Sequence, residues 1–215
     1  NLLNENPGLD VGVHLVITSE WNNIKWRPLT CCPSLVDRDG YFFPFIWQRE
    51  DYAEGTALKN ANWKINEIEA EFRAQIEMAK RHVPQISHLN CHMGCENCAP
   101  EIAALVQKLA VEYDLDIDTR KLGYKSIGLW DKQDSTASQR INSAVRIIKN
   151  LKPGKYLFIE HPGFDTPEMR AIWHTGYENV AADRDAVTKV FTSQQLRDAV
   201  KSADITLVSY RDAAK

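Results

Sequence analysis

The sequence predicts an α/β fold in which strands and helices alternate around a parallel sheet or barrel. Residues 10–18 form a nearly continuous β-branched run, residues 62–82 carry apolar side chains at helical spacing, and residues 85–91 form a short apolar segment. Strand, helix and strand at this spacing are typical of a βαβ unit with parallel strands. This order of elements is compatible with a closed barrel and with an open, doubly wound sheet.

The segments around the first strand are less regular. Pro7 and Gly8 indicate that residues 1–10 are a helix tail followed by a turn. A domain that opens on a helix tail leads us to expect an earlier strand, so that the domain is N-terminally incomplete. The aromatic-rich stretch at about 19–60 has the length of a functional loop or lid.

The rest of the chain continues the alternation and predicts a single domain over residues 1–215. Pro100 suits a helix start, and Pro153 with Gly154 marks a break. The expected elements are a helix over 100–113, a strand over 115–118, a helix over 135–151, a strand over 155–161, a helix over 193–203 and a strand over 205–209.

Charge and composition exclude several classes of partner. The net charge of −3, with 26 basic and 29 acidic residues, argues against nucleic acid. Because no apolar stretch approaches the roughly 20 residues that span a bilayer, no membrane partner is expected. Five cysteines, an odd number, do not indicate a disulfide framework and favour a reducing, cytoplasmic compartment. The expected missing start keeps a periplasmic or secreted location open.

Three of the six histidines share one type of position. His14 lies inside the first strand, His92 follows the strand over 85–91, and His161 is the last residue of the strand over 155–161. A single histidine there is more often structural. Because carboxyl ends of parallel strands converge on active sites, three together predict a metal-binding site. His88 shares a strand face with His92, and either orients a ligand or caps the strand.

Cys91, Cys95 and Cys98 have the spacing of the cluster motif of radical SAM enzymes. Asn97 stands where that motif usually has an aromatic residue, and the motif normally follows the first strand. A small structural zinc site is a second interpretation, since thiolates suit zinc. Buried or surface thiols without a ligand are the third.

Three stretches, LDVGVHLVITSEW (9–21), ISHLNCHMG (86–94) and FIEHPGFDTPEMRAI (158–172), resemble the YdjC-like carbohydrate deacetylase family. The similarity continues in residues 174–188 and in the final VFTSQQLRDAV and ITLVSYRD, so it spans nearly the whole chain. It implies a distorted (β/α) barrel with parallel strands. It also implies removal of acetyl groups from N-acetylated sugars such as chitooligosaccharides.

The resemblance also implies roles for the histidines. His14 and His92 fall on the family's metal-binding positions, and His161 falls beside the substrate, where it is a candidate catalytic proton donor. Asn90 stands where the family usually has aspartate. The family's paired aspartates, one a metal ligand and one a base, have no counterpart after Asn1, which leads us to expect them on the missing first strand.

These residues suit amide hydrolysis. A divalent metal ion held by two histidines and a carboxylate lowers the pKa of bound water and polarises the carbonyl. The ligand types favour zinc, nickel or iron, and a water-rich site favours magnesium. An imidazole has a suitable pKa to protonate the leaving amine. The predicted function is therefore a metal-dependent carbohydrate deacetylase, with a catalytically inactive sugar-binding barrel as the alternative.

Sugar contacts are predicted from the aromatic loop and from polar side chains. Trp21 and Trp26 can offer flat faces to pyranose rings, although a tryptophan is as often core. His88 and Arg184 are further candidates, and a surface salt bridge is the simpler interpretation of Arg184. An exposed strand edge beside residues 10–18 would favour association into a homo-oligomer.

Overall fold

The computed structural model describes residues 2–215, and its contacts divide the chain into two compact units. Unit 1 comprises Asn1–Thr119 and Ser209–Lys215, and unit 2 comprises Arg120–Val208. Each unit has its own cluster of buried apolar side chains. A single domain over residues 1–215 stays a prediction.

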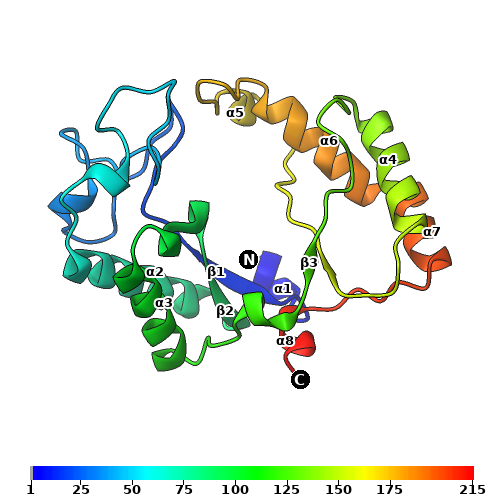
Figure 1. The fold of residues 1–215 in the computed structure, drawn as a ribbon, viewed down its shortest axis with the longest axis horizontal. Helices are drawn as coiled ribbons and strands as arrows, with labels where there is room; N and C mark the ends of the chain where they lie inside the picture. The colour runs from blue at the N-terminus through cyan, green and yellow to red at the C-terminus, as the bar shows by residue number, and fades with distance from the viewer. Residues whose placement is uncertain (1) are drawn as a thin grey trace. The chain divides into compact units, whose positions relative to one another are not determined.

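Unit 1 is built on two parallel strands (Figure 1). β1 (Val11–Leu15) pairs with β2 (Ile86–Cys91), and α2 (Ile65–His82) precedes β2 in the chain. Register pairs Val13 with Leu89 and Leu15 with Cys91. This arrangement confirms the α/β class with parallel strands. Closure into a barrel and a missing strand beside β1 stay predictions.

Apolar side chains at helical spacing fix the helices of unit 1. α2 buries Ile68, Phe72 and Ile76, which lie four residues apart and therefore share one face. Four elements complete the unit with these bounds: α1 (Leu2–Glu5), η3 (His92–Asn97), α3 (Pro100–Glu112) and α8 (Tyr210–Ala213). The core of unit 1 therefore lies between the two strands and the helices that follow them in sequence.

Residues 19–60 form a long loop that packs against the core of unit 1. It contains two short 3-10 turns, η1 (Pro33–Leu35) and η2 (Leu58–Asn60). Eight of its apolar side chains are buried: Trp21, Cys32, Leu35, Phe42, Phe45, Ile46, Ala57 and Leu58. The loop therefore contributes to the core of unit 1, which explains its many aromatic residues.

Two glutamates of α2 hold this loop. Glu71, 1% exposed, accepts hydrogen bonds from the Leu29 and Thr30 backbone amides at 3.2 and 2.9 Å, and from the Thr30 hydroxyl at 2.7 Å. Glu67 accepts the Ser34 amide and hydroxyl, both at 2.8 Å. Because these loop amides lie outside any ladder, the carboxylates supply the acceptors that they need.

Replacing Glu71 by alanine is expected to lower the free energy of unfolding by about 2–4 kcal/mol. Each buried donor left without an acceptor costs roughly 1–3 kcal/mol, partly relieved by water that enters the space. Urea denaturation of both proteins measures the difference. Glu77→Ala, at an exposed position of the same helix, is the matched control and should cost less than about 1 kcal/mol. Equal losses would contradict a specific role for Glu71.

Unit 2 contains a short parallel pair, β3 (Lys125–Ser126) and β4 (Tyr156–Leu157). Its helices pack on one another around Leu129, Ala144 and Val190. The remaining elements are η4 (Thr119–Leu122), which begins at the unit boundary, and α4 (Ala137–Lys149), α5 (Pro167–Arg170), α6 (Val180–Thr192) and α7 (Gln194–Ser202). The capping box of Thr136 and Gln139 fixes the start of α4.

The strand predictions after residue 113 are largely wrong. The strand predicted over 155–161 ends at Leu157, so His161 is not at a strand end. Phe158 turns instead toward the rings of Trp130 and Phe191, 5.2 and 5.5 Å away between centroids. Residues 115–118 form only an isolated bridge, and residues 205–209 form no strand. β-branched residues pack as strands only where a partner edge exists.

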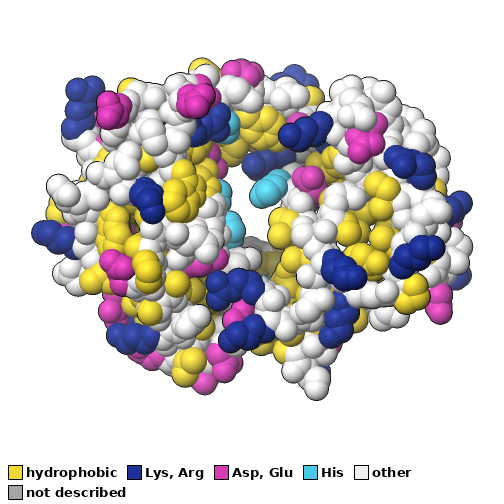
Figure 2. All heavy atoms as spheres, in the orientation of Figure 1, with side chains coloured by type: hydrophobic (Ala, Val, Ile, Leu, Met, Phe, Trp, Pro, Cys, Tyr) yellow, Lys and Arg dark blue, Asp and Glu magenta, His cyan; other side chains and the backbone are white. Residues whose placement is uncertain are grey.

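Surface features add two observations. Among residues 2–215, none of the helices has both the length and the apolar character needed to cross a membrane. On the face drawn in Figure 2, Lys and Arg side chains lie among Asp and Glu side chains. Such mixing weakens the long-range field that attracts polyanions.

Candidate active site

The structure brings together two of the three predicted histidines. His14 lies on β1, and its register partner on β2 is Asn90, two residues before His92. The Nε2 atom of His14 lies 3.2 Å from Nδ1 of His92, with ring centroids 5.2 Å apart. Parallel pairing of β1 and β2 thus delivers both imidazoles to one end of the sheet.

Neighbouring oxygen atoms determine which ring nitrogen of each histidine carries the proton. Nδ1 of His14 lies 2.6 Å from Oδ1 of Asn90, and an amide oxygen only accepts, so this nitrogen carries the proton. Nε2 of His92 lies 3.4 Å from Oε2 of Glu20, and a carboxylate favours a proton on the nitrogen that faces it. The lone pairs of His14 Nε2 and His92 Nδ1 then face each other.

Glu20 is a site residue that sequence reasoning missed. It is 6% exposed, and neither its Oε2 nor the Nε2 of His92 makes a hydrogen bond, although both atoms are buried. Glu20 comes five residues after the end of β1, so it also follows a strand end, as the predicted histidine sites do. A glutamate after a strand is common on surfaces, and only burial distinguishes this one.

The donor atoms fit one divalent cation. Ligand bonds of about 2.0–2.1 Å at tetrahedral or octahedral angles put two nitrogens about 2.9–3.4 Å apart, and the observed separation is 3.2 Å. Two facing lone pairs repel each other unless a cation or a proton lies between them.

A tight turn positions His92. Met93 and Gly94 have φ angles of 53° and 61°, in the left-handed region. That conformation is unusual for methionine and costs on the order of 1–3 kcal/mol. The turn reverses the chain directly after His92, so the His92 side chain stays at the end of β2.

His88, a residue of β2, is buried among neighbouring side chains. It is 5% exposed, its Nδ1 lies 2.8 Å from the Ser87 hydroxyl, and its ring is 4.9 Å from the Tyr210 ring. A Cβ atom on Gly12 would lie 2.6 Å from Cδ2 of His88, so glycine is required there. Burial lowers the pKa of His88, which keeps it neutral. A sugar contact for His88 stays a prediction.

The predicted aromatic contacts differ in exposure. Trp21 is 7% exposed, whereas Trp26 is half-buried and donates its indole N–H to the Thr18 carbonyl at 2.8 Å. Trp26 and His14 line a groove of about 410 Å³, together with Arg27, Phe42, Gln75 and Met78 among others. Trp26 therefore shares this groove with His14.

His161 and Arg184 belong to unit 2. His161 is exposed and precedes Pro162 and Gly163. The Gly163 amide donates to the Arg184 carbonyl at 3.2 Å, and Thr188 donates to the Gly163 carbonyl at 2.7 Å. These contacts fasten the His161 loop to α6. Convergence of His161 with His14 and His92 stays a prediction.

Beside Arg184, Asp183 joins a buried polar network. It accepts hydrogen bonds from the guanidinium of Arg140 and from the Tyr177 hydroxyl, the latter at 2.6 Å. Burial and the hydrogen bond to Asp183 raise the pKa of Tyr177 to about 12. Tyr177 therefore stays protonated at neutral pH and serves as a donor, and the network fixes the start of α6.

The cysteines form a separate group. Cys91, Cys95 and Glu96 have their ligand atoms within 4.8 Å of one another, and Cys98 lies outside this group. A hydrogen bond with Cys95, together with burial, raises the pKa of the Cys91 thiol. No described cysteine is in a disulfide.

Comparisons with known proteins agree on one family. A family model described as YdjC-like protein matches residues 1–202. A carbohydrate deacetylase of Thermus thermophilus is 27% identical over 194 residues, which cover 78% of this chain and 67% of that protein. A carbohydrate deacetylase of Listeria monocytogenes is 29% identical over 218 residues, covering 97% and 80%.

A solved structure supports the fold. The crystal structure of a proposed cellobiose-phosphate cleavage protein of Enterococcus faecalis superposes with a TM-score of 0.67. It is 18% identical, and the match covers 98% of this chain and 80% of that one. This likeness concerns the fold alone.

Proposed function

This chain belongs to the YdjC-like protein family, and from that premise we propose that it is a metal-dependent hydrolase that removes acetyl groups from N-acetylated sugars or oligosaccharides. Relatives named carbohydrate deacetylases support the reaction class. The observation that carries the proposal is the facing pair of His14 Nε2 and His92 Nδ1, 3.2 Å apart.

The two imidazoles would hold a divalent cation, Zn²⁺ or Mg²⁺, through these nitrogens. When bound, such a cation lowers the pKa of water and polarises the acetyl carbonyl. Oδ1 of Asn90 accepts a hydrogen bond from Nδ1–H of His14, which leaves Nε2 of His14 free to bind the cation. The negative charge of Glu20, whose Oε2 lies 3.4 Å from Nε2 of His92, favours a proton on that nitrogen and so leaves Nδ1 of His92 as the ligand atom.

His161 is the proposed general acid. Departure of an amine requires a proton, and a protonated imidazole can give one. Gly163 and Thr188 anchor the His161 loop, so its ring is carried on a fixed backbone. Arg184, on the α6 helix to which this loop is bonded, can donate to sugar hydroxyls. This role requires His161 to reach the sugar that the histidine pair binds.

Trp26 provides the proposed sugar platform. Its half-buried ring lines the groove that also contains His14. A pyranose ring stacked there would present an N-acetyl group toward the histidine pair. The indole N–H bond to Thr18 holds the ring in place, which lowers the entropy lost on binding.

Acetate release tests this proposal. The full-length protein is incubated with N-acetylglucosamine oligomers, and acetate and metal content are measured on the same samples. Chelation should abolish release, and Zn²⁺ or Mg²⁺ should restore it. The matching glucosamine oligomers, which lack acetyl groups, are the control. Sugar binding without acetate release under every metal would instead identify an inactive sugar-binding protein.

A further inference from the structure

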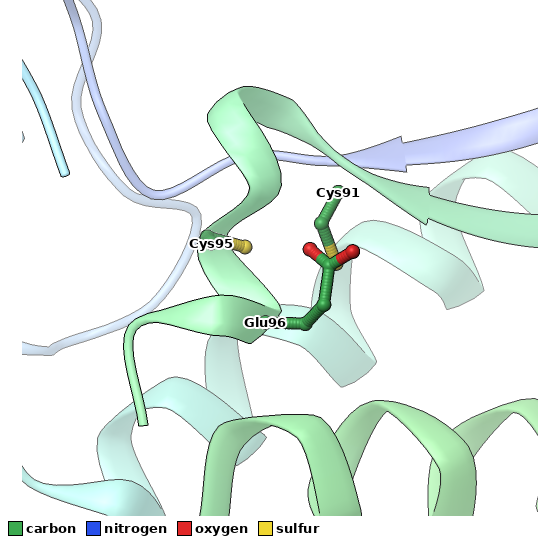
Figure 3. Close-up of side chains that lie close together, drawn as sticks. All are labelled: Cys91, Cys95 and Glu96. Carbon is green, nitrogen blue, oxygen red and sulfur yellow. The ribbon is translucent and has the colours of Figure 1, made fainter. Parts of the chain in front are cut away.

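The side chains of Cys91, Cys95 and Glu96 lie close together (Figure 3). Cys91 is the last residue of β2, and the other two belong to η3. Because Met93 and Gly94 have positive φ angles, the chain folds back and returns Cys95 and Glu96 to Cys91. Their two sulfurs and a carboxylate oxygen lie within 4.8 Å of one another.

Burial makes this grouping costly without a ligand. Cys95 is fully buried, and Cys91 and Glu96 are half-buried. The Oε2 atom of Glu96 is itself buried and makes no hydrogen bond. A carboxylate oxygen that loses its water without gaining a donor costs several kcal/mol, whereas a bound cation would satisfy it.

We propose that Cys91, Cys95 and Glu96 form a second metal site, separate from the histidine pair, that binds Zn²⁺. Two thiolates and one carboxylate are zinc ligands, and three protein ligands leave a position for water. The two thiol protons leave as the cation enters. The softer sulfur ligands favour zinc over magnesium and so distinguish this site from the nitrogen and oxygen ligands at His14 and His92.

The position of this site gives it a structural consequence. His92 lies between Cys91 and Cys95 in the chain, within the six residues that the cation would close into a loop. A cation bound to both sulfurs would stabilise the left-handed backbone of Met93 and Gly94, and would thereby hold His92 in place without binding it.

Cobalt spectroscopy tests the proposal in the full-length protein. The protein is reduced, stripped of metal by a chelator and titrated with Co²⁺, which occupies zinc sites and gives near-ultraviolet charge-transfer absorption only with thiolate ligands. We expect this absorption in the wild type, and its displacement by Zn²⁺. Cys91→Ser and Cys95→Ser should each lose it. Cys31→Ser, at an exposed thiol outside the group, is the matched control and should keep it.

Two further variants keep the test decisive. His14→Ala should keep the thiolate absorption, because this site does not use that residue, so failure of the deacetylase proposal leaves this one standing. Glu96→Gln should keep the absorption but bind Co²⁺ at least roughly tenfold more weakly, as expected for loss of a ligand. An absent band in the reduced wild type, or a band that persists in Cys95→Ser, would overturn the proposal. So would a Cys91–Cys95 disulfide in place of a bound cation.

Discussion

Alanine at His14 or at His92 is expected to remove the proposed cation and nearly all acetate release. Either change deletes one of the two nitrogens that face each other across 3.2 Å. Activated water and the polarised carbonyl are then lost together. Several kcal/mol of transition-state stabilisation correspond to a loss of kcat of at least about 10³-fold. Metal analysis and acetate release on the same preparation provide the measurement.

The control for this prediction is His174→Ala. His174 is a half-buried histidine whose backbone amide and carbonyl bond Tyr177, and alanine keeps these bonds. It should retain the metal content and acetate release of the wild type. Because Cys91 and Cys95 are proposed to hold their own ion, metal must be counted with those thiols blocked. A His14→Ala protein that retains both cation and turnover would refute the proposed site.

His161→Ala is expected to keep the cation and lose most turnover. A proton donor acts in the transition state and contributes roughly 10²–10⁴-fold, so kcat should fall by that factor while metal content stays unchanged. His161 is exposed on a loop fastened to α6, so its removal leaves the packing of unit 2 intact. The pH profile of kcat adds a second measurement, because the limb due to the general acid should disappear.

Together, the two predictions distinguish a metal ligand from a proton donor. Should His161→Ala lose its metal as completely as His14→Ala, His161 is a ligand and the assigned roles are wrong. Full retained activity would mean that the proton comes from elsewhere. The same His174→Ala protein shows whether any histidine change in unit 2 lowers the rate.

Local periodicity was enough to predict the βαβ unit of unit 1. Strand β1 lies within the predicted 10–18, α2 within 62–82, and β2 within 85–91. These elements were predictable because burial of one helix face and of short β-branched runs leaves a regular pattern in the sequence. Since both strands are parallel, their carboxyl ends coincide, and the meeting of His14 with His92 followed from topology alone.

Unit 2 was predicted less well, because its elements depend on contacts that periodicity does not encode. β4 stops at Leu157, where Phe158 turns toward Trp130 and Phe191. Helix α6, absent from the prediction, begins in a charged segment whose Asp183 is paired with Arg140 from α4. Arg140, 43 residues away, neutralises the charge of Asp183, so the helix face that carries Asp183 can be buried. No local sequence pattern shows this pairing.

The sequence by itself determined the fold class, the family and the histidine pair. Periodicity predicts the fold class, local motifs indicate the family, and the parallel arrangement of the strands next to His14 and His92 predicts that the two rings meet. Only the tertiary structure decided the roles of the glutamates. Glu20, Glu71 and Glu96 look like ordinary surface residues in the sequence, yet the chain buries Glu20 against His92, Glu71 against loop amides and Glu96 beside two thiols. A buried carboxylate loses its water, so its charge needs a specific partner. For Glu20 and Glu71 that partner lies in a distant part of the chain, and for Glu96 it depends on the turn at Met93 and Gly94 that returns the chain to Cys91.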